Sequence, residues 1–332
     1  MNPFFSILIP AYNQVGKMDR CFASLEAQKF ADYEVIFTND GSTDDTYAML
    51  EKFCAPDSRR KLTNHEKNSS LLAARYTGMS LAKGRYILFL DSDDWLSDDA
   101  LALLHEALSA QPDVDFLRFG YVLEPEGKTV EPYETDDYKK SLIECEFPPA
   151  IWKNCYRRDM IERVLERTEP FYCNMGEDVF FASVFSDCFQ KTATLCKYIY
   201  HYDCGTGMSS SQAAVSSGKM QRDLQSVLAS RDNLIRYYEK YAPQDLIAVK
   251  KRTVDMVCFV LFQGVFGAKD WNMLPDMIKV LATPNSQAYF DFCCDELIPL
   301  RMRSAAGQLD KMTLWGEYLK RRVKLYETEA KS

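Results

Sequence analysis

The segment that most constrains the fold of this chain is a run of apolar residues that ends abruptly in acids. Tyr86–Leu90 contains only apolar and aromatic residues, which is typical of a strand buried on both faces of a sheet. Asp91, Asp93 and Asp94 follow it within four positions. Carboxylates at the end of a buried strand are costly to desolvate unless a positive partner lies beside them. The sequence therefore predicts a divalent cation, a basic side chain or a metal-bound diphosphate at this strand end.

Capping of the next helix is the alternative role for these acids. That helix is expected to begin near residues 97–99, where Ser97, Asp98 and Asp99 already supply cap residues. Capping therefore explains Asp91 and Asp93 poorly, and we favour a metal site with oxygen ligands at this point of the chain.

Strand and helix patterns alternate through the first part of the chain. We predict strands at residues 5–9, 33–38, 62–65, 86–90 and 114–119, and helices at residues 17–28, 43–53, 70–82 and 98–108. The alternation predicts an α/β fold with a mostly parallel central sheet flanked by helices, whose first strand is halted by Pro10. Ligands of such sheets bind beyond the carboxyl ends of the strands. Pro10–Asn13, Asp40 and Asp91–Asp93 follow three of these strands, so we expect them at one edge of the sheet.

The pattern changes after residue 120. Residues 123–149 are polar and acidic and carry prolines, which predicts a flexible excursion over the surface. Helices are expected at residues 158–166 and from residue 175, and a strand at residues 192–200. A loop rich in Gly and Ser at residues 204–217 precedes an all-helical remainder, with helices at residues 218–241, 244–267, 271–281, 287–297 and 302–326. We therefore predict two domains, residues 1–210 and residues 211–332.

Composition excludes some classes of function. A net charge of −8 argues against a general nucleic-acid binder, because neutralising phosphates needs a basic surface. No apolar run approaches the length of a membrane span, and no basic leader precedes the first strand. The eleven cysteines include no Cys-x-x-Cys pair, which favours reduced thiols and a cytoplasmic location.

Five short motifs occur in order along the first two-thirds of the chain. They occupy residues 6–13, 34–44, 73–78, 84–94 and 176–178, and the last of them reads Gly-Glu-Asp. In order and spacing they make the sequence resemble the inverting family 2 glycosyltransferases. The resemblance implies the GT-A fold, a Rossmann-like arrangement that binds nucleotide-diphospho-sugars. It does not cover the helical C-terminal third.

The resemblance implies a set of residues around the nucleotide base. The residues that would border the base are Pro10, Ala11, Tyr12 and Asn13. Asp40 would accept the imide N–H of uracil, a role that suits a carboxylate because it only accepts hydrogen bonds when ionised.

A second set would bind the rest of the donor. Arg75 would lie near the diphosphate or the acidic cluster, with an exposed helical arginine as the alternative. Asp91 would contact the ribose or a metal-bound water, and Ser92 lies between it and Asp93. Asp93 would hold Mg²⁺ or Mn²⁺ against the diphosphate, as expected for a hard cation with oxygen ligands.

The resemblance also implies a general base for the acceptor hydroxyl. Asp178 would take that role with Glu177 orienting the acceptor or a loop, although both could simply begin a helix. His201 could join Asp93 on the metal, or be structural. Trp152 could stack on an acceptor sugar or pack in the core. Residues 205–209 could form a lid over the donor.

The main hypothesis is a metal-dependent inverting glycosyltransferase that moves a sugar from a UDP-sugar to a hydroxyl of a glycan or lipid-linked acceptor, in surface polysaccharide or glycolipid synthesis. A sugar nucleotidyltransferase is one alternative, but Pro10–Gln14 is not the Gly-rich basic loop that it needs. A non-catalytic sugar-nucleotide-binding module is the other, although Asp93 and Asp178 are both present. No Gly-x-Gly-x-x-Gly follows a predicted strand, which disfavours a dinucleotide oxidoreductase.

Two further features leave questions open. Relatives commonly carry a Gly-rich turn where this chain has Asn68–Leu72, and often Asn where it has Tyr76, so the sugar stays undefined. Basic residues in the last predicted helix, Arg321 and Arg322 among them, could contact an anionic membrane or line a packing face.

Overall fold

The chain forms two compact units. The computed structural model describes residues 2–135, 137–143, 149–205, 217–267, 274–283, 286–305, 308 and 311–329. Unit 1 comprises Met1–Lys139, Phe147–Tyr172 and Phe181–Gln212, and unit 2 comprises Lys140–Glu146, Cys173–Phe180 and Ala213–Ser332. The predicted domain boundary after residue 210 falls outside the described residues and stays a prediction.

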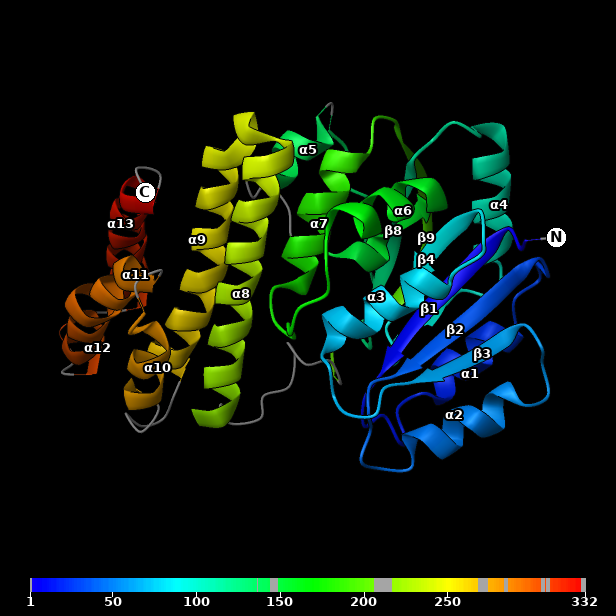
Figure 1. The fold of residues 1–332 in the computed structure, drawn as a ribbon, viewed down its shortest axis with the longest axis horizontal. Helices are drawn as coiled ribbons and strands as arrows, with labels where there is room; N and C mark the ends of the chain where they lie inside the picture. Colours follow the sequence, from blue (N-terminus) through cyan, green and yellow to red (C-terminus); the bar gives the residue numbers. More distant parts are fainter. Residues whose placement is uncertain are drawn as a thin grey trace. The chain divides into compact units, whose positions relative to one another are not determined.

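Unit 1 is built on one nine-stranded sheet (Figure 1). Its strands are β1 (Phe5–Ala11), β2 (Tyr33–Asn39), β3 (Arg60–Asn64), β4 (Tyr86–Phe89), β5 (Trp95–Leu96), β6 (Phe116–Glu124), β7 (Lys128–Val130), β8 (Asn154–Arg157) and β9 (Thr192–Asp203). Their spatial order is β3-β2-β1-β4-β8-β6-β9-β5, with β7 paired to β6. β3, β2, β1 and β4 run parallel, whereas β8 is antiparallel to both of its neighbours. The sheet is therefore mixed: four strands from the start of the chain run parallel, and β6 and β9 form a second parallel pair.

Two parts of the sheet differ from the prediction. β8 was not predicted, and it inserts its four residues between β4 and β6. The segment 123–149, predicted as an irregular excursion, instead begins as a hairpin, because β6 extends to Glu124 and pairs with β7. A strand of three or four residues contains too few alternations of polar and apolar residues to be recognised from the sequence.

Helices cover both faces of the sheet, as predicted. The helices described up to residue 188 are α1 (Asp19–Glu26), α2 (Thr46–Cys54), α3 (Leu71–Leu81), α4 (Ala100–Ala110), α5 (Tyr138–Ile143), the short η1 (Ile151–Lys153), α6 (Arg158–Arg167) and α7 (Glu177–Cys188). Of these, α5 from Lys140 and α7 up to Phe180 belong to unit 2. Figure 1 shows α3 and α6 in front of the sheet and α1 behind it. A close approach at Gly84 fixes the entry to β4, since a Cβ there would lie 2.4 Å from the backbone nitrogen of Ser6.

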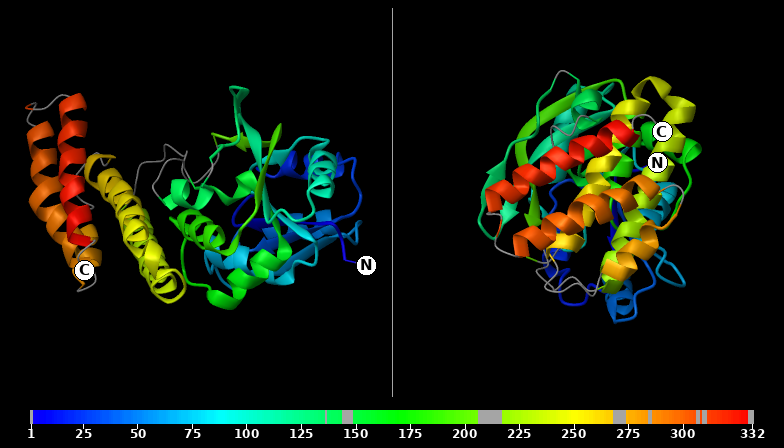
Figure 2. Two further views of the ribbon diagram at one scale, coloured as in Figure 1. Left: turned by 90° about the horizontal axis from the view of Figure 1, so that it is seen from above. Right: turned by 90° about the vertical axis from the view of Figure 1, so that its left-hand side faces the viewer.

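Unit 2 is helical in its described residues, as predicted (Figure 2, yellow to red). Beyond α7 it contains α8 (Ser217–Tyr241), η2 (Pro243–Asp245), α9 (Leu246–Phe262), η3 (Gln263–Gly267), α10 (Leu274–Leu281), α11 (Gln287–Asp291), η5 (Phe292–Leu297), α12 (Ile298–Ala305) and α13 (Lys311–Glu329). The single helix predicted at residues 302–326 is two, α12 and α13. In the described residues no helix combines the length and the apolar character that crossing a membrane requires.

Candidate functional site

The carboxyl ends of β1, β2 and β4 meet at one edge of the parallel part of the sheet. β1 lies between the other two, with Pro10 opposite Thr38 and Leu8 opposite Phe89. The backbone ladder continues past the strands, because the N–H of Asp40 donates to the carbonyl of Ala11 over 2.9 Å. The structure therefore brings together the three segments that the sequence predicted at this edge.

The segment after β1 is attached to the segment after β2. We had expected Pro10 to halt β1, but the strand runs on to Ala11. Its pairing with β4 ends at Leu8, so the missing N–H of Pro10 costs no hydrogen bond to β4. Asn13 adopts a φ of 53°. Its side-chain oxygen accepts the N–H of Thr43 over 2.9 Å, and its own N–H donates to Ser42 over 3.0 Å. Tyr12, which directly precedes Asn13 in the chain, is 42% exposed.

Asp40 anchors the loop that leads into α3. Its carboxylate is buried and accepts the backbone N–H groups of Ser69 (2.8 Å) and Ser70 (2.9 Å). His65 Nδ1 lies 2.6 Å from the same carboxylate, and its Nε2 lies 2.8 Å from the hydroxyl of Thr77. Since an ionised carboxylate offers about four acceptor positions, three protein donors leave room for one more. The sequence did not reveal this anchoring role.

Ser70 holds an unusual backbone conformation at the start of α3. It is fully buried, with φ 96° and ψ 158°, a region that residues other than glycine rarely adopt. Its hydroxyl accepts the N–H of Ala73 over 3.5 Å and thereby caps the helix. The sequence departs here from the Gly-rich turn of its relatives, and the structure keeps the glycine-type backbone with a serine.

Arg75 binds the acidic segment after β4. Its side chain is 1% exposed, and Nη2 lies 2.9 Å from Oδ1 of Asp91. The alternative of an exposed helical arginine is therefore wrong, and the contact with the acidic cluster is confirmed. A buried guanidinium keeps its charge and orients the carboxylate that it contacts. Asp91 is thus a positioned carboxylate, with its side chain 26% exposed.

Asp94 and Tyr200 fix the turn that carries Asp91, Ser92 and Asp93. The Asp91 N–H donates to the hydroxyl of Tyr200 over 3.2 Å, and that hydroxyl donates to Asp94 over 2.5 Å. Ser92 is buried, whereas Asp93 is half-buried. Burial, and then the charges of Asp91 and Asp93, raise the pKa of Asp94 to about 9. The charges of Asp91 and Asp93 thus oppose ionisation of Asp94, and a cation beside them would lessen that opposition.

His201 and Trp152 both pack within unit 1. His201 lies within β9, where Nδ1 is 2.9 Å from Glu124 and Nε2 is 3.2 Å from the hydroxyl of Ser97. Both ring nitrogens thus have protein partners, which supports the structural alternative for this residue. Trp152 is only 6% exposed and lies parallel to Tyr200 with ring centroids 4.5 Å apart, which supports core packing. A metal-ligand role for His201 and an acceptor contact for Trp152 stay predictions.

Glu177 and Asp178 begin α7, in the part of it that belongs to unit 2. The preceding Gly176 has φ 89°, a backbone conformation that favours glycine, and a Cβ there would also lie 2.6 Å from the sulfur of Met256. Glu177 is buried and Asp178 half-buried. The role of Asp178 as a base stays a prediction, and so does the lid at residues 205–209, of which only Gly205 is described.

A metal site at this edge would need ligands from outside the protein. Within the residues that the structure describes, no three His, Cys, Asp or Glu side chains converge as a complete metal-ligand set. Mg²⁺ commonly binds through one or two carboxylates together with water and substrate phosphates. Asp93, with Asp91 beside it, fits that type of site.

Comparison with known proteins places the chain in context. The family profile described as "Glycosyl transferase family 2" matches residues 6–173. EpsH, a candidate glycosyltransferase of Bacillus subtilis (strain 168), is 32% identical over 168 residues, which cover 48% of this chain and 48% of EpsH. Chondroitin synthase of Pasteurella multocida (strain Pm70) is 41% identical over 101 residues, which cover 30% of this chain and 10% of that protein. The chain thus spans about half the length of EpsH.

The fold of the chain also resembles a solved structure. The crystal structure of S. aureus TarS residues 1–349 in complex with UDP-GlcNAc superimposes with a TM-score of 0.62. It covers 100% of this chain and 91% of that one, at 19% sequence identity. At that identity the likeness shows the fold alone, a GT-A domain followed by a helical region.

Proposed function

Because the chain belongs to glycosyltransferase family 2, we propose that it transfers a sugar from a nucleotide sugar to an acceptor hydroxyl group. The observation that carries the proposal is the edge at which β1, β2 and β4 end. Asp40 follows β2, and Asp91 and Asp93 follow β4, the two parallel strands that flank β1. Such an edge is where open α/β sheets bind their ligands. Carboxylates there suit a ligand with hydrogen-bond donors and a diphosphate that brings its own cation.

The donor is proposed to be a UDP-sugar. Asp40 has one acceptor position left after its three protein donors, and the imide N–H of uracil could occupy it. Tyr12 is exposed at the end of β1, where an aromatic ring can pack on a base. TarS, which has the same fold, was crystallised with UDP-GlcNAc, and this supports the same class of donor here. The sequence match to a chondroitin synthase supports a polysaccharide or related glycan as product.

The residues after β4 are proposed to hold the diphosphate through Mg²⁺ or Mn²⁺. Asp93 would bind the ion, and Asp91, oriented by Arg75, would bind the ribose or a water on the ion. When bound, such an ion stabilises negative charge on a leaving diphosphate as a Lewis acid. The protein keeps the two carboxylates in place through Tyr200, whose hydroxyl fixes the backbone of Asp91.

Proton removal from the acceptor is assigned to Asp178. An attacking hydroxyl must lose its proton, and a carboxylate positioned beside it can accept that proton as a general base. Direct attack on the sugar, without a covalent intermediate on the enzyme, inverts the configuration at the transferred carbon. Asp178→Asn is therefore expected to abolish transfer while donor binding persists, measured as sugar transfer and as thermal shift with UDP. Loss of UDP binding in this variant would contradict the assignment.

A donor panel tests the proposal. UDP- and GDP-sugars are incubated with the protein and Mn²⁺, and donor hydrolysis and the shift in melting temperature are measured. We expect a response to at least one UDP-sugar that is lost in Asp93→Asn. Asp98→Asn, a matched change at an exposed acid nearby, should behave as wild type. No response to any nucleotide sugar, or an equal response in Asp93→Asn, would refute the proposal.

The basic residues of the C-terminal helices bear on a contact with an anionic membrane. Two basic residues of α13 are paired within unit 2: Arg321 with Glu296 and Glu317, and Arg322 with Asp255 over 3.0 Å. Ion pairs of this kind lower the charge available to anionic lipids. They favour the alternative that these helices serve packing. Flotation with anionic vesicles, for the protein with and without α13, measures how much this helix contributes to membrane binding.

A further inference from the structure

A basic cleft lies at the opposite edge of the sheet from the proposed donor site. It has a volume of about 270 Å³, and its lining includes Pro3, Lys83, Arg85, Arg157, Arg158 and Asp159. Pro3 lies two residues before the start of β1 and Arg85 directly precedes β4, so the cleft is at the amino ends of these strands. β1 has seven residues, which at about 3.3 Å per residue puts roughly 20 Å between the two edges.

The backbone around this cleft is held rigidly. The N–H of Arg85 donates to the carbonyl of Pro3 over 3.0 Å, and the N–H of Arg158 donates to the carbonyl of Arg85 over 2.9 Å. Tyr86 is paired with Arg157 in the β4–β8 ladder. Three segments far apart in sequence are thus bonded to one another, so their charged side chains emerge from a fixed frame.

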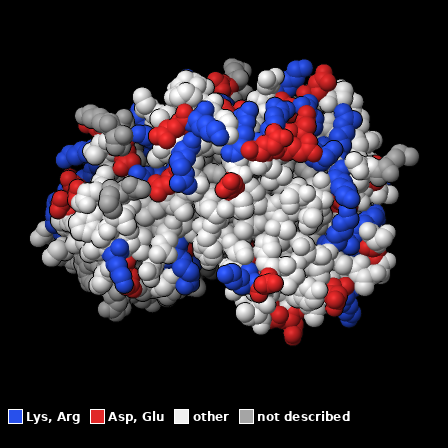
Figure 3. Space-filling view, viewed as in Figure 1, with Lys and Arg blue, Asp and Glu red and all other residues white. Residues whose placement is uncertain are grey.

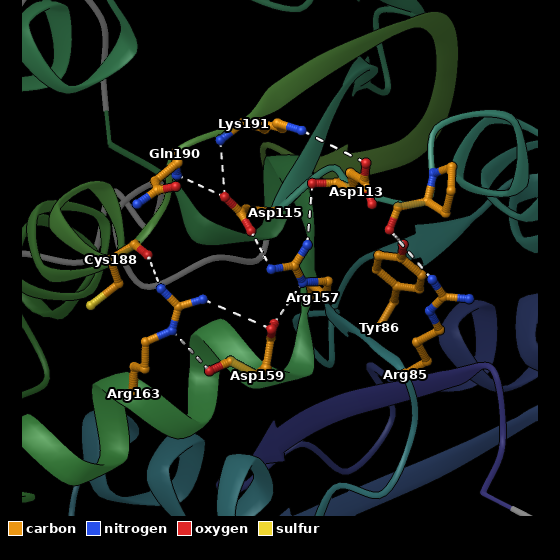
Figure 4. A network of polar contacts seen from close by, with 11 residues as sticks. Arg85, Tyr86, Asp113, Asp115, Arg157, Asp159, Arg163, Cys188, Gln190 and Lys191 are labelled. Carbon is orange, nitrogen blue, oxygen red and sulfur yellow. Dashed lines mark hydrogen bonds and ion pairs between the residues drawn. The ribbon is translucent and has the colours of Figure 1, made fainter.

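The positive charges of the cleft are only partly balanced. Arg157 is compensated, because Asp115 and Asp159 each approach it within 2.7 Å (Figure 4). Arg158 pairs with the exposed Glu162 over 2.5 Å, while its Nε is buried and has no hydrogen-bond partner among the described residues.

Two cations have no acidic partner in the part of the chain that the structure describes. The Lys83 ammonium is exposed and forms no ion pair there. Glu34 accepts the backbone N–H of Lys83 over 2.7 Å, but the charged partner of its carboxylate is Lys61. Arg85 is exposed, and its guanidinium donates to the carbonyl of Pro112 over 3.3 Å (Figure 4). Figure 3 shows Lys and Arg side chains gathered along the right-hand side of the view, the side on which Figure 1 marks the N-terminus. This local excess of positive charge is opposite in sign to the net charge of −8 of the chain.

We propose that this cleft is a binding site for a phosphate group, carried by a small soluble phosphate or by a phospholipid headgroup. A guanidinium and an ammonium that lack carboxylate partners are the groups that proteins use to bind phosphate oxygens. The volume is below the range of about 300–1,000 Å³ typical of sites for larger ligands, so it suits one phosphate group better than a whole sugar nucleotide. The site does not depend on the proposed transferase function.

The test removes the two uncompensated charges and measures both sources of phosphate. Calorimetric titration with inorganic phosphate reports the soluble ligand. Co-sedimentation with phosphatidylcholine vesicles, with and without phosphatidylglycerol, reports the lipid headgroup. The double variant is Lys83→Gln with Arg85→Gln. Lys52→Gln with Lys128→Gln is the matched control, since both lysines are exposed and the change in net charge is equal. Unchanged melting temperatures check that both proteins fold.

Each outcome decides the proposal. Wild-type binding of inorganic phosphate that weakens about tenfold or more in the cleft variant only, a loss of about 1.4 kcal/mol, supports a soluble ligand. Binding that is seen only with phosphatidylglycerol vesicles, and is lost only in the cleft variant, supports a lipid headgroup. Absence of both forms of binding in wild type, or an equal loss in the two double variants, overturns the proposal.

Discussion

Ser70 stores backbone strain that a glycine would release. With φ 96° and ψ 158° it lies in a region where residues other than glycine are strained by about 1–3 kcal/mol. Ser70→Gly and Ser70→Ala both remove the hydroxyl contacts with Ala73 and Phe171, so these losses cancel when the two variants are compared. Only the alanine variant keeps the strain. Glycine carries about 0.5–1 kcal/mol more unfolded-state entropy, so Ser70→Gly should be the more stable of the two by about 1 kcal/mol.

A second serine of the same helix provides the control. Ser80 is exposed in the last turn of α3, where the backbone is helical. Ser80→Ala should therefore be more stable than Ser80→Gly by about 0.5–1 kcal/mol, the opposite order to position 70. Urea unfolding gives the comparison, with midpoints converted to free energies of unfolding at a common m-value. If Ser70→Ala equals or exceeds Ser70→Gly in stability, the turn is not strained and the reasoning is wrong.

Three further predictions concern buried charges in unit 1. Asp40→Asn should lower the free energy of unfolding by about 2–3 kcal/mol. The two carboxylate oxygens accept the N–H groups of Ser69 and Ser70, whereas an amide has only one oxygen and its NH₂ group cannot accept. Urea unfolding measures the loss, and Asp45→Asn is the control at an exposed acid. Arg75→Met should lower the free energy of unfolding by about 3 kcal/mol in the same assay. This value is at the low end for breaking a buried ion pair, because Asp91 is partly exposed. Burial acts to raise the pKa of Glu34, but hydrogen bonds from Lys61, Ser6 and Lys83 outweigh it and lower the pKa below 4.5. Glu34 thus stabilises the fold above pH 4.5, and this contribution is lost as the pH falls through its folded pKa, so the drop in melting temperature on acidification should be smaller in Glu34→Gln.

The sequence predicted the parallel part of the sheet and the edge that its strands form. Short apolar runs alternate with segments of helical periodicity, and this alternation predicts the parallel architecture. Because parallel strands have their carboxyl ends at the same edge, the sequence also predicts that Asp40 and Asp91 lie at one edge of the sheet. β8 was missed because Asn154–Arg157 is short and follows no alternation. Its position between β4 and β6 depends on pairing with residues far away in the chain.

The partners of the site residues could not be predicted in the same way. Asp40 contacts Ser69 and Ser70, and Asp91 contacts Tyr200, a residue of β9 whose apolar strand pattern gave no sign of a polar role. Such contacts depend on how loops close onto strand ends, which residue spacing does not encode. The Arg75 contact was anticipated only because a family resemblance supplied it.

The contacts at this edge decide how substitutions there should be interpreted. Asp40, Asp91 and Asp94 each accept protein donors, so replacing any of them disturbs a loop or turn as well as any bound donor. Loss of activity in Asp40→Asn or Asp94→Asn therefore does not by itself assign a role in sugar transfer. Activity has to be compared with the free energy of unfolding of the same variant. A residue that binds the cation should lose activity without a matching loss of stability, and Asp93 is where we expect that separation.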